Sequence, residues 1–98
     1  MTYLFFIAIL LHVFYAQSFA QGAKFTVRSD IGCNPFLVEV IDLSTSPPGT
    51  AINYDYGDGV EDTLTTHLYS HPGVYRIIQT VANAVPRQDT VYIEVINQ

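Results

Sequence analysis

The sequence predicts an all-β protein built from short strands, as in a sandwich or a barrel. From Lys24 onward, apolar residues alternate with polar ones instead of recurring at helical spacing. The apolar segments are short, and clusters of Gly, Pro, Asn, Asp and Ser separate them. No segment has amphipathic helical periodicity of useful length, and there is no internal repeat. The expected fold class is therefore all-β.

The first two strands are expected before residue 43. One is predicted at 24–28, and it stops in the turn-rich segment 29–35 (S-D-I-G-C-N-P). The second is predicted at 36–41, where alternate residues make one apolar face. Segment 43–50 (L-S-T-S-P-P-G-T) then breaks the pattern, because two adjacent prolines cannot donate to a sheet ladder.

The remaining strands are expected after the proline-containing segment 43–50. A third strand at 52–56 has its apolar residues on one side, and 57–59 (G-D-G) ends it in a tight turn. Weaker alternation predicts one or two short strands around 63–69. The strongest strand patterns lie at 74–82 and 89–96, and we expect these two strands to pair antiparallel.

Length and charge limit the function classes. A chain of 98 residues supports a single domain. Four Lys and Arg residues stand against nine carboxylates, which gives a net charge of -5. This balance opposes a phosphate-neutralising stripe, so nucleic acid is not an expected partner. An acidic surface instead attracts divalent cations or basic surfaces weakly.

Residues 1–20 are predicted to be a signal peptide. The apolar run 4–15 is shorter than the roughly 20 apolar residues of a membrane span. Ser18 and Ala20 place small side chains before a cut at Gln21, as a signal peptidase requires. The expected product is secreted or at the cell surface and has no membrane span after cleavage. A short uncleaved anchor is the alternative.

Cys33 has no cysteine partner in the chain. The first interpretation of this residue is a small, buried apolar side chain. The alternative is a thiol that pairs with another chain or with a missing segment.

Two linked sequence blocks stand out in the second half of the chain. The first is Y-D-Y-G-D-G at 54–59, and the second is H-L-Y-S-H-P-G-V-Y-R-I at 67–77. Together they resemble the PKD (polycystic kidney disease) repeat, in its bacterial-type secreted form. That family carries an aromatic-Asp-aromatic-Gly-Asp-Gly block followed by His-x-Tyr and Pro-Gly-x-Tyr-x-aliphatic. The matching residues are Tyr54, Asp55, Tyr56, Gly57, Asp58, Gly59, His67, Tyr69, Pro72, Gly73 and Tyr75.

The resemblance implies a PKD domain at 24–97 with an immunoglobulin-like β-sandwich fold of about seven strands. Such modules are spacers or protein or glycan contact domains, and the resemblance implies neither catalysis nor a cofactor. The chain departs from the family at three positions. Tyr54 stands where tryptophan is usual, Gln79 stands where an aliphatic is usual, and Cys33 lacks the second cysteine that often follows the penultimate strand.

The motif also has a physical interpretation of its own. Gly57 and Gly59 permit positive φ at a sharp reversal, and Asp55 and Asp58 act first as turn builders. At least two of the four motif tyrosines are expected in the core. Gln79 shares the inward register of that region, so it is either hydrogen-bonded, or a bulge turns Ile78 inward in its place.

The acidic group Asp55, Asp58, Glu61 and Asp62 is the one candidate metal site. Calcium prefers several oxygen ligands, but Gly57 and Gly59 fall where an EF-hand loop requires oxygen side chains. A solvated acidic turn is the first interpretation, with calcium as the alternative.

Histidine and serine give no enzyme signature. His67 and His71 fall on a strand end and a loop, which disfavours a zinc pair. We expect His67 to tie neighbouring strands by a hydrogen bond and His71 to be exposed. Ser70 lies beside His71, but neighbouring side chains usually diverge, so a nucleophile-base pair is not expected.

These features predict a non-catalytic extracellular module that acts as a spacer or an adhesion and protein-interaction domain, within a larger modular protein. The alternative is a free-standing secreted glycan-binding module, for which Tyr92 and Tyr69 are expected to be exposed along one face. An enzyme is the third hypothesis, and it requires a preorganised Ser, His and Asp set or a metal triad.

Overall fold

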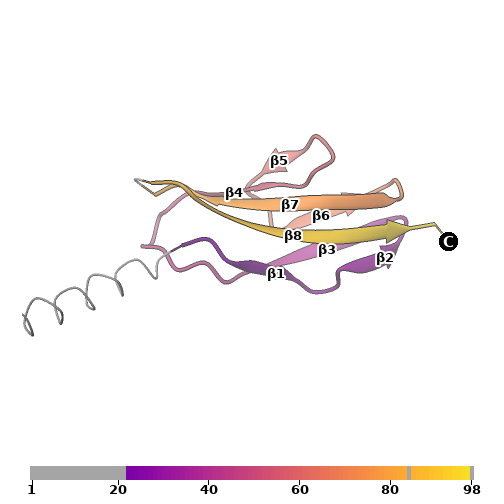
Figure 1. Ribbon diagram of the computed structural model, residues 1–98, viewed down its shortest axis with the longest axis horizontal. Coiled ribbons are helices and arrows are strands. Elements are labelled where there is room, and N and C mark those ends of the chain that lie inside the picture. The colour runs from indigo at the N-terminus through magenta and orange to yellow at the C-terminus, as the bar shows by residue number, and fades with distance from the viewer. Residues whose placement is uncertain (1–21, 84, 98) are drawn as a thin grey trace, which may run out of the picture.

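Two β-sheets face each other in the computed structural model, which describes residues 22–83 and 85–97 (Figure 1). Within these residues there are eight strands and no helix. The strands are β1 (Phe25–Val27), β2 (Ile31–Cys33), β3 (Phe36–Asp42), β4 (Ile52–Asp55), β5 (Glu61–Asp62), β6 (Thr66–Tyr69), β7 (Gly73–Val81) and β8 (Arg87–Ile96). The predicted all-β sandwich is therefore confirmed.

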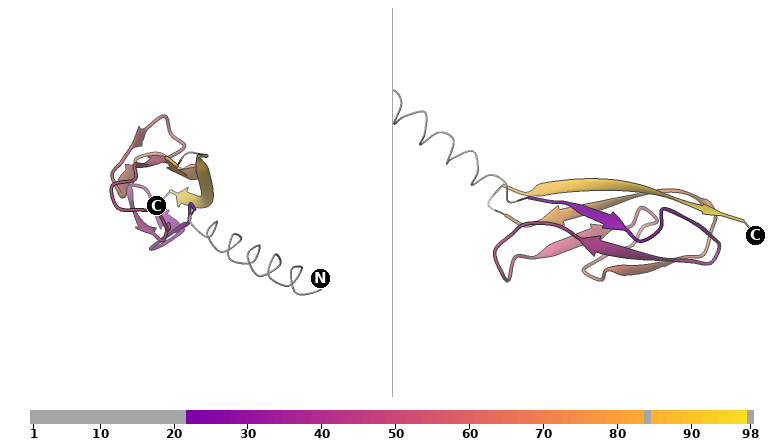
Figure 2. Two further views of the ribbon diagram at one scale, coloured as in Figure 1. Left: turned by 90° about the vertical axis from the view of Figure 1, so that its left-hand side faces the viewer. Right: turned by 90° about the horizontal axis from the view of Figure 1, so that it is seen from below.

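The three-stranded sheet has the order β1-β3-β6, and the five-stranded sheet has the order β2-β8-β7-β4-β5. Neighbouring strands pair antiparallel except β2 and β8, which run parallel. The long strands β7 and β8 lie side by side in Figure 1, as their strong alternation predicts. The end-on view of Figure 2 shows the strands surrounding a single interior.

The chain changes sheets between β1 and β2, and this is where the sequence prediction fails. The segment 29–35 was expected to be a turn, but its central residues form β2. The Glu94 amide donates to the Asp30 carbonyl and the Asn34 amide to the Ile96 carbonyl, at 2.8 Å each. A three-residue parallel strand is too short to show periodicity, and its pairing with the far end of the chain has no local signal.

The strands predicted at 52–56 and around 63–69 agree with the structure in part. β4 ends at Asp55, one residue before the predicted end of the third strand. Of the short strands expected around 63–69, β6 lies inside that range, whereas β5 lies just before it. β5 has two residues and pairs only with the end of β4, across the tight turn that joins these two strands.

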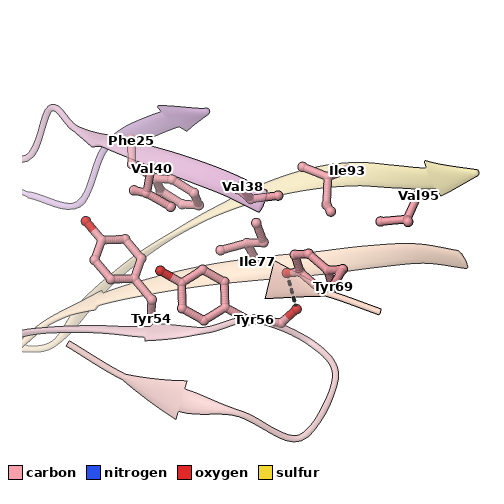
Figure 3. Packing of buried hydrophobic residues seen from close by; sticks show 9 residues of the cluster. All are labelled: Phe25, Val38, Val40, Tyr54, Tyr56, Tyr69, Ile77, Ile93 and Val95. Atoms are coloured by element: carbon pink, nitrogen blue, oxygen red, sulfur yellow. Dashed lines mark hydrogen bonds between the residues drawn. The ribbon is translucent and has the colours of Figure 1, made fainter. Parts of the chain in front are cut away.

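The core lies between the two sheets and is rich in tyrosine (Figure 3). Tyr54, Tyr56 and Tyr69 are almost completely buried, which confirms the prediction that at least two motif tyrosines are in the core. The Tyr69 hydroxyl donates to the Tyr56 carbonyl at 2.6 Å, drawn as the dashed line in Figure 3. The Tyr56 hydroxyl donates to the Leu64 carbonyl. Each large ring is thus buried with its polar tip satisfied.

Gln79 is fully buried on β7 and keeps the inward register. Its Nε2 donates to the Tyr54 hydroxyl at 2.9 Å and to Asp42 Oδ1 at 3.0 Å. Its Oε1 accepts from the Lys24 amide at 2.8 Å. The hydrogen-bonded alternative for this residue is therefore confirmed, and no bulge is needed to bury Ile78 instead.

Cys33 is an exposed free thiol at the end of β2, so its interpretation as a buried apolar side chain is wrong. It pairs in register with Ile96, and both side chains point to solvent. The predicted signal peptide, residues 1–20, lies outside the described residues. Within the described part of the chain, no helix has the length and apolar character needed to cross a bilayer.

Candidate functional site: the outer face of the five-stranded sheet

The register of the five-stranded sheet determines which side chains face solvent. On β8, Ile93 and Val95 are buried, so Tyr92 and Glu94 point outward because successive side chains alternate between faces. Tyr92 lies opposite Arg76 of β7, and Glu94 lies opposite Val74. On its other side, Glu94 pairs with Ile31 of β2. Three strands therefore contribute to one continuous patch.

This patch contains an open depression of about 350 Å³, which we call the Tyr92 depression. Its lining residues come from β7, β8 and the start of β2: Asp30, Ile31, Val74, Tyr92, Ile93 and Glu94. Tyr92 is 61% exposed, Val74 69% and Ile31 50%. An exposed ring is thus bordered by exposed aliphatic side chains, on a sheet whose opposite face is the packed core.

Two acidic residues, Asp30 and Glu94, are among those that line the depression. Neither Asp30 nor Glu94 makes a side-chain hydrogen bond or ion pair with any described residue. By contrast, Glu39 pairs with Arg28 at 2.9 Å on the other sheet. The Asp30 and Glu94 carboxylates are therefore free to accept hydrogen bonds from a ligand.

The motif glycines and aspartates build the turn between β4 and β5. Gly57 has φ 80° and Gly59 has φ 93°, both in the left-handed region. Asp55 Oδ1 accepts from the Gly57 amide at 2.9 Å, and Asp58 Oδ1 accepts from the Val60 amide at 3.3 Å. These residues have the turn-building role expected from the sequence.

His67 connects β6 to this turn. Its Nε2 lies 2.6 Å from Asp58 Oδ2, and its ring stacks on Tyr56 with 4.4 Å between ring centroids. The expected hydrogen bond of His67 is present, but it ties β6 to the turn between β4 and β5 and not to a neighbouring strand. His71, Pro72 and Gly73 are exposed, and the His71 carbonyl accepts from the Tyr75 hydroxyl at 2.7 Å.

Burial changes the acidity of the core tyrosines. It raises the pKa of Tyr56 and Tyr69 well above the usual range, and nearby carboxylates, Asp62 for Tyr56 and Asp58 for Tyr69, add to the effect. Burial also raises the pKa of Tyr54, against an opposing hydrogen bond from Gln79. These rings are neutral structural groups at neutral pH.

The carboxylates proposed for calcium serve mainly as turn acceptors. Asp55, Asp58 and Asp62 each accept a backbone amide two residues ahead, and Glu61 points to solvent on β5. Across residues 22–83 and 85–97, no three His, Cys, Asp or Glu side chains gather in a way that could hold a metal ion.

The face expected for a glycan binder, with Tyr69 beside Tyr92, does not exist. Tyr69 is 1% exposed and belongs to the core, whereas Tyr92 is on the outer surface. Arg76 lies directly opposite Tyr92, and Val74 and Ile31 line the same depression as Tyr92. Sequence reasoning could have found Val74 from its outward register on β7, but Ile31 needed the unpredicted strand β2.

No family model matches this chain, and no curated protein matches it. A solved structure does match the chain, and it concerns the structural basis for the promiscuous specificity of carbohydrate-binding modules from the β-sandwich superfamily. It is 25% identical, with a TM-score of 0.66, over 78% of this chain and 34% of that one. The chain thus spans about a third of that protein's length. The likeness agrees with the two-sheet architecture.

Proposed function

We propose that this chain is a secreted or cell-surface, non-catalytic module of the PKD type that contacts a protein partner through the Tyr92 depression. The module is the domain at 24–97, which remains after a signal peptide at 1–20 is removed, and it works within a larger modular protein. The PKD assignment is supported by the structural roles of the motif: Tyr54, Tyr56 and Tyr69 fill the core, and Gly57 and Gly59 form the turn.

The observation that carries the contact role is the exposure of Tyr92, Val74 and Ile31 as one patch from three strands. Single exposed apolar side chains are common, whereas a contiguous patch with a polar rim marks an interaction site. Tyrosine suits such a site because its ring supplies apolar area and its hydroxyl a hydrogen bond, at low cost in side-chain entropy.

The absence of catalysis is part of the proposal and has separate support. Among the described residues, Ser70 and His71 share no hydrogen bond, and the histidine-carboxylate pair of His67 with Asp58 serves the turn. The described residues hold no metal-binding group. The depression is also open rather than enclosed, so it lacks the closed shape by which many active sites expel water.

Glycan binding is the second candidate, and the likeness to carbohydrate-binding modules favours it. The exposed face of Tyr92 can stack against a sugar ring, with the carboxylates of Asp30 and Glu94 as hydrogen-bond acceptors. The volume of the depression, about 350 Å³, is close to the lower limit of roughly 300 Å³ for small-ligand sites.

A retention assay tests the contact role. The mature chain is passed over immobilised collagen, fibronectin, cellulose and chitin, and compared with Tyr92→Ala and Leu68→Ala. Leu68 is the matched control, because it is 52% exposed but lies on the outer face of the three-stranded sheet. We expect retention on a protein support to fall at least tenfold for Tyr92→Ala and to be unchanged for Leu68→Ala.

Retention on cellulose or chitin with the same Tyr92 dependence would replace the protein partner with a glycan. Equal losses in both variants, or no retention on any support, would contradict a contact role for this face and leave the module as a spacer.

A further inference from the structure

We infer that the partner of the Tyr92 depression is a basic protein surface, which inserts a lysine or arginine side chain between Asp30 and Glu94. This inference rests on the proposed contact function and specifies the chemistry of the partner. It follows from the charge, the apolar lining and the aromatic ring of the depression.

The two acidic residues that line the depression lie next to each other in the sheet. The Glu94 amide donates to the Asp30 carbonyl at 2.8 Å, and Glu94 pairs in register with Ile31, the residue after Asp30. The two residues are therefore neighbours across the β2 and β8 pair. Neither side chain has a described cationic partner, so a cation from outside meets two carboxylates with no competing internal ion pair.

The apolar lining fits the stem of a basic side chain. Lysine and arginine pack their methylene groups along apolar surface while the charged end stays at the rim. Ile31 and Val74 offer such surface at 50% and 69% exposure. A purely polar or acidic side chain would gain nothing from these aliphatic groups.

The exposed ring of Tyr92 adds a third attraction. A cation within about 6 Å of the centroid of an aromatic ring is attracted by the negative face of the ring. Tyr92 and Glu94 lie on the same face of β8, two residues apart, so one cationic group can contact both. Arg76 lies beside Tyr92 on β7 and repels a cation, so the cation should approach from the side of Asp30 and Glu94.

The wider surface has the same sign. The outward residues of the five-stranded sheet include Asp55 and Glu61 at its far edge, in addition to the acidic residues of the depression. All nine carboxylates and all four Lys and Arg residues lie at 24–97, so the module itself carries the net charge of -5. Such a field attracts basic partners and repels sulfated or uronic glycans.

A matched pair of peptides tests this inference by NMR titration of the mature chain. The probes are acetyl-Gly-Gly-Lys-Gly-Gly-amide and the same peptide with Gln in place of Lys. We expect the Lys peptide to shift the amide signals of Ile31, Val74 and Glu94, and the Gln peptide to shift them at least fivefold less. Raising the ionic strength from 0.02 to 0.3 M should weaken the association several-fold, because exposed charges are screened.

Charge-removing variants locate the effect. Asp30→Asn and Glu94→Gln should each reduce the association constant of the Lys peptide at least threefold. Glu61→Gln is the control, since it removes one charge from the same sheet but outside the depression. The effect of Glu61→Gln on the association constant should be less than a third of the effect of Asp30→Asn or Glu94→Gln.

Equal shifts from the two peptides, or equal effects of Glu94→Gln and Glu61→Gln, would overturn the basic partner. Cellohexaose is titrated as the glycan probe, and shifts from it alone at Tyr92 would also overturn it in favour of a neutral glycan. If the Lys peptide fails while Tyr92→Ala still abolishes retention on a support, this inference falls and the contact function stands. If retention also fails, both fall.

Discussion

At the scale of single residues, buried polar groups decide how this small core is held together. Gln79 is fully buried and joins the β1 end of the chain, through the Lys24 amide, to Tyr54 and Asp42. Asp89 adds a parallel link, because its Oδ2 accepts from the Phe25 amide at 3.0 Å. The side chains of Gln79 and Asp89, on the five-stranded sheet, thus accept hydrogen bonds from backbone amides at the start of β1, in the other sheet.

Replacing Gln79 with leucine should be strongly destabilising. The substitution leaves the Lys24 amide and the Tyr54 hydroxyl without their partner, and an unsatisfied buried group costs about 1 to 3 kcal/mol. We expect Gln79→Leu to lower the free energy of unfolding in urea by about 2 to 3 kcal/mol. Gln88→Leu is the control: Gln88 is exposed, so its loss should stay within about 0.5 kcal/mol. Equal losses would mean that the Gln79 network contributes no net stability.

The buried tyrosines make a prediction for alkaline pH. The pKa of Tyr54, Tyr56 and Tyr69 is raised in the folded chain, so their stabilising effect is fully present below the unfolded value near pH 10. Above that pH the unfolded tyrosines ionise first, and the free energy of unfolding should fall by about 1.4 kcal/mol per pH unit for each ring. Urea unfolding at pH 8, 9.5, 10.5 and 11 measures this slope.

Tyr69→Phe loses one hydrogen bond, which lowers the free energy of unfolding by the same amount at every pH. After that constant loss is subtracted, the alkaline slope of the free energy of unfolding should be smaller by the contribution of one ring. A flat profile up to pH 11 in the unsubstituted chain would contradict the burial of these hydroxyls.

At the scale of elements, the turn after β4 depends on two glycines in different surroundings. Both have positive φ, but a Cβ on Gly57 would lie 2.6 Å from the Arg76 carbonyl oxygen, whereas a Cβ on Gly59 would meet nothing within 4 Å. Of the two glycines, only Gly57 therefore lies close against the backbone of β7. This contact fixes the position of the hairpin that carries β5.

The two glycines form a matched experiment. Gly59→Ala should cost about 1 to 2 kcal/mol, the strain of a left-handed backbone for a residue with a Cβ. Gly57→Ala adds a clash with backbone and should cost about 3 kcal/mol or more. Thermal or urea unfolding of the two variants measures the difference. A similar cost for both would show that β7 can move away from the turn.

At the scale of the whole molecule, the two sheets leave two different outer faces. The three-stranded sheet exposes Leu37 and Leu68 directly opposite each other, with the Arg28 and Glu39 ion pair nearby. The five-stranded sheet exposes Tyr92 in a depression that is also lined by Asp30 and Glu94, which form no ion pair with any described residue. The second face is the proposed contact site because it combines shape, an aromatic ring and charge.

The predicted cleavage at Gln21 leaves a chain that should fold by itself. The core begins at Phe25, and the first described backbone contact is that of Gly22 with Thr45. We expect a chain of residues 21–98 to give an all-β circular dichroism spectrum and a cooperative unfolding transition. Intact-mass analysis of secreted material should find an N-terminus at Gln21. An unfolded 21–98 chain would show that residues 1–20 contribute to the fold.

Much of the fold could be predicted from the sequence, because alternation and turn chemistry are local. The strands β3, β7 and β8 have enough residues for a period of two to be visible, and the turn at Gly57-Asp58-Gly59 follows from its glycines. The burial of Tyr54, Tyr56 and Tyr69 was predicted from the tyrosine motif itself, and these residues lie on β4, directly after β4 and on β6. The polar partners of Gln79 could not be predicted in this way, because they are distant in sequence. Tyr54 lies 25 positions away, Asp42 37 positions and Lys24 55 positions.

The sequence alone determined the all-β class, the main strands and the burial of the motif tyrosines, since each depends on residues a few positions apart. Only the tertiary structure decided the exposure of Cys33, the strand β2 and the Tyr92 depression. All three depend on the parallel pairing of residues 31–33 with 94–96, across more than 60 positions of chain. Contacts so distant in sequence leave no periodic trace, and they form because the folded sheet has an edge that β2 can pair with.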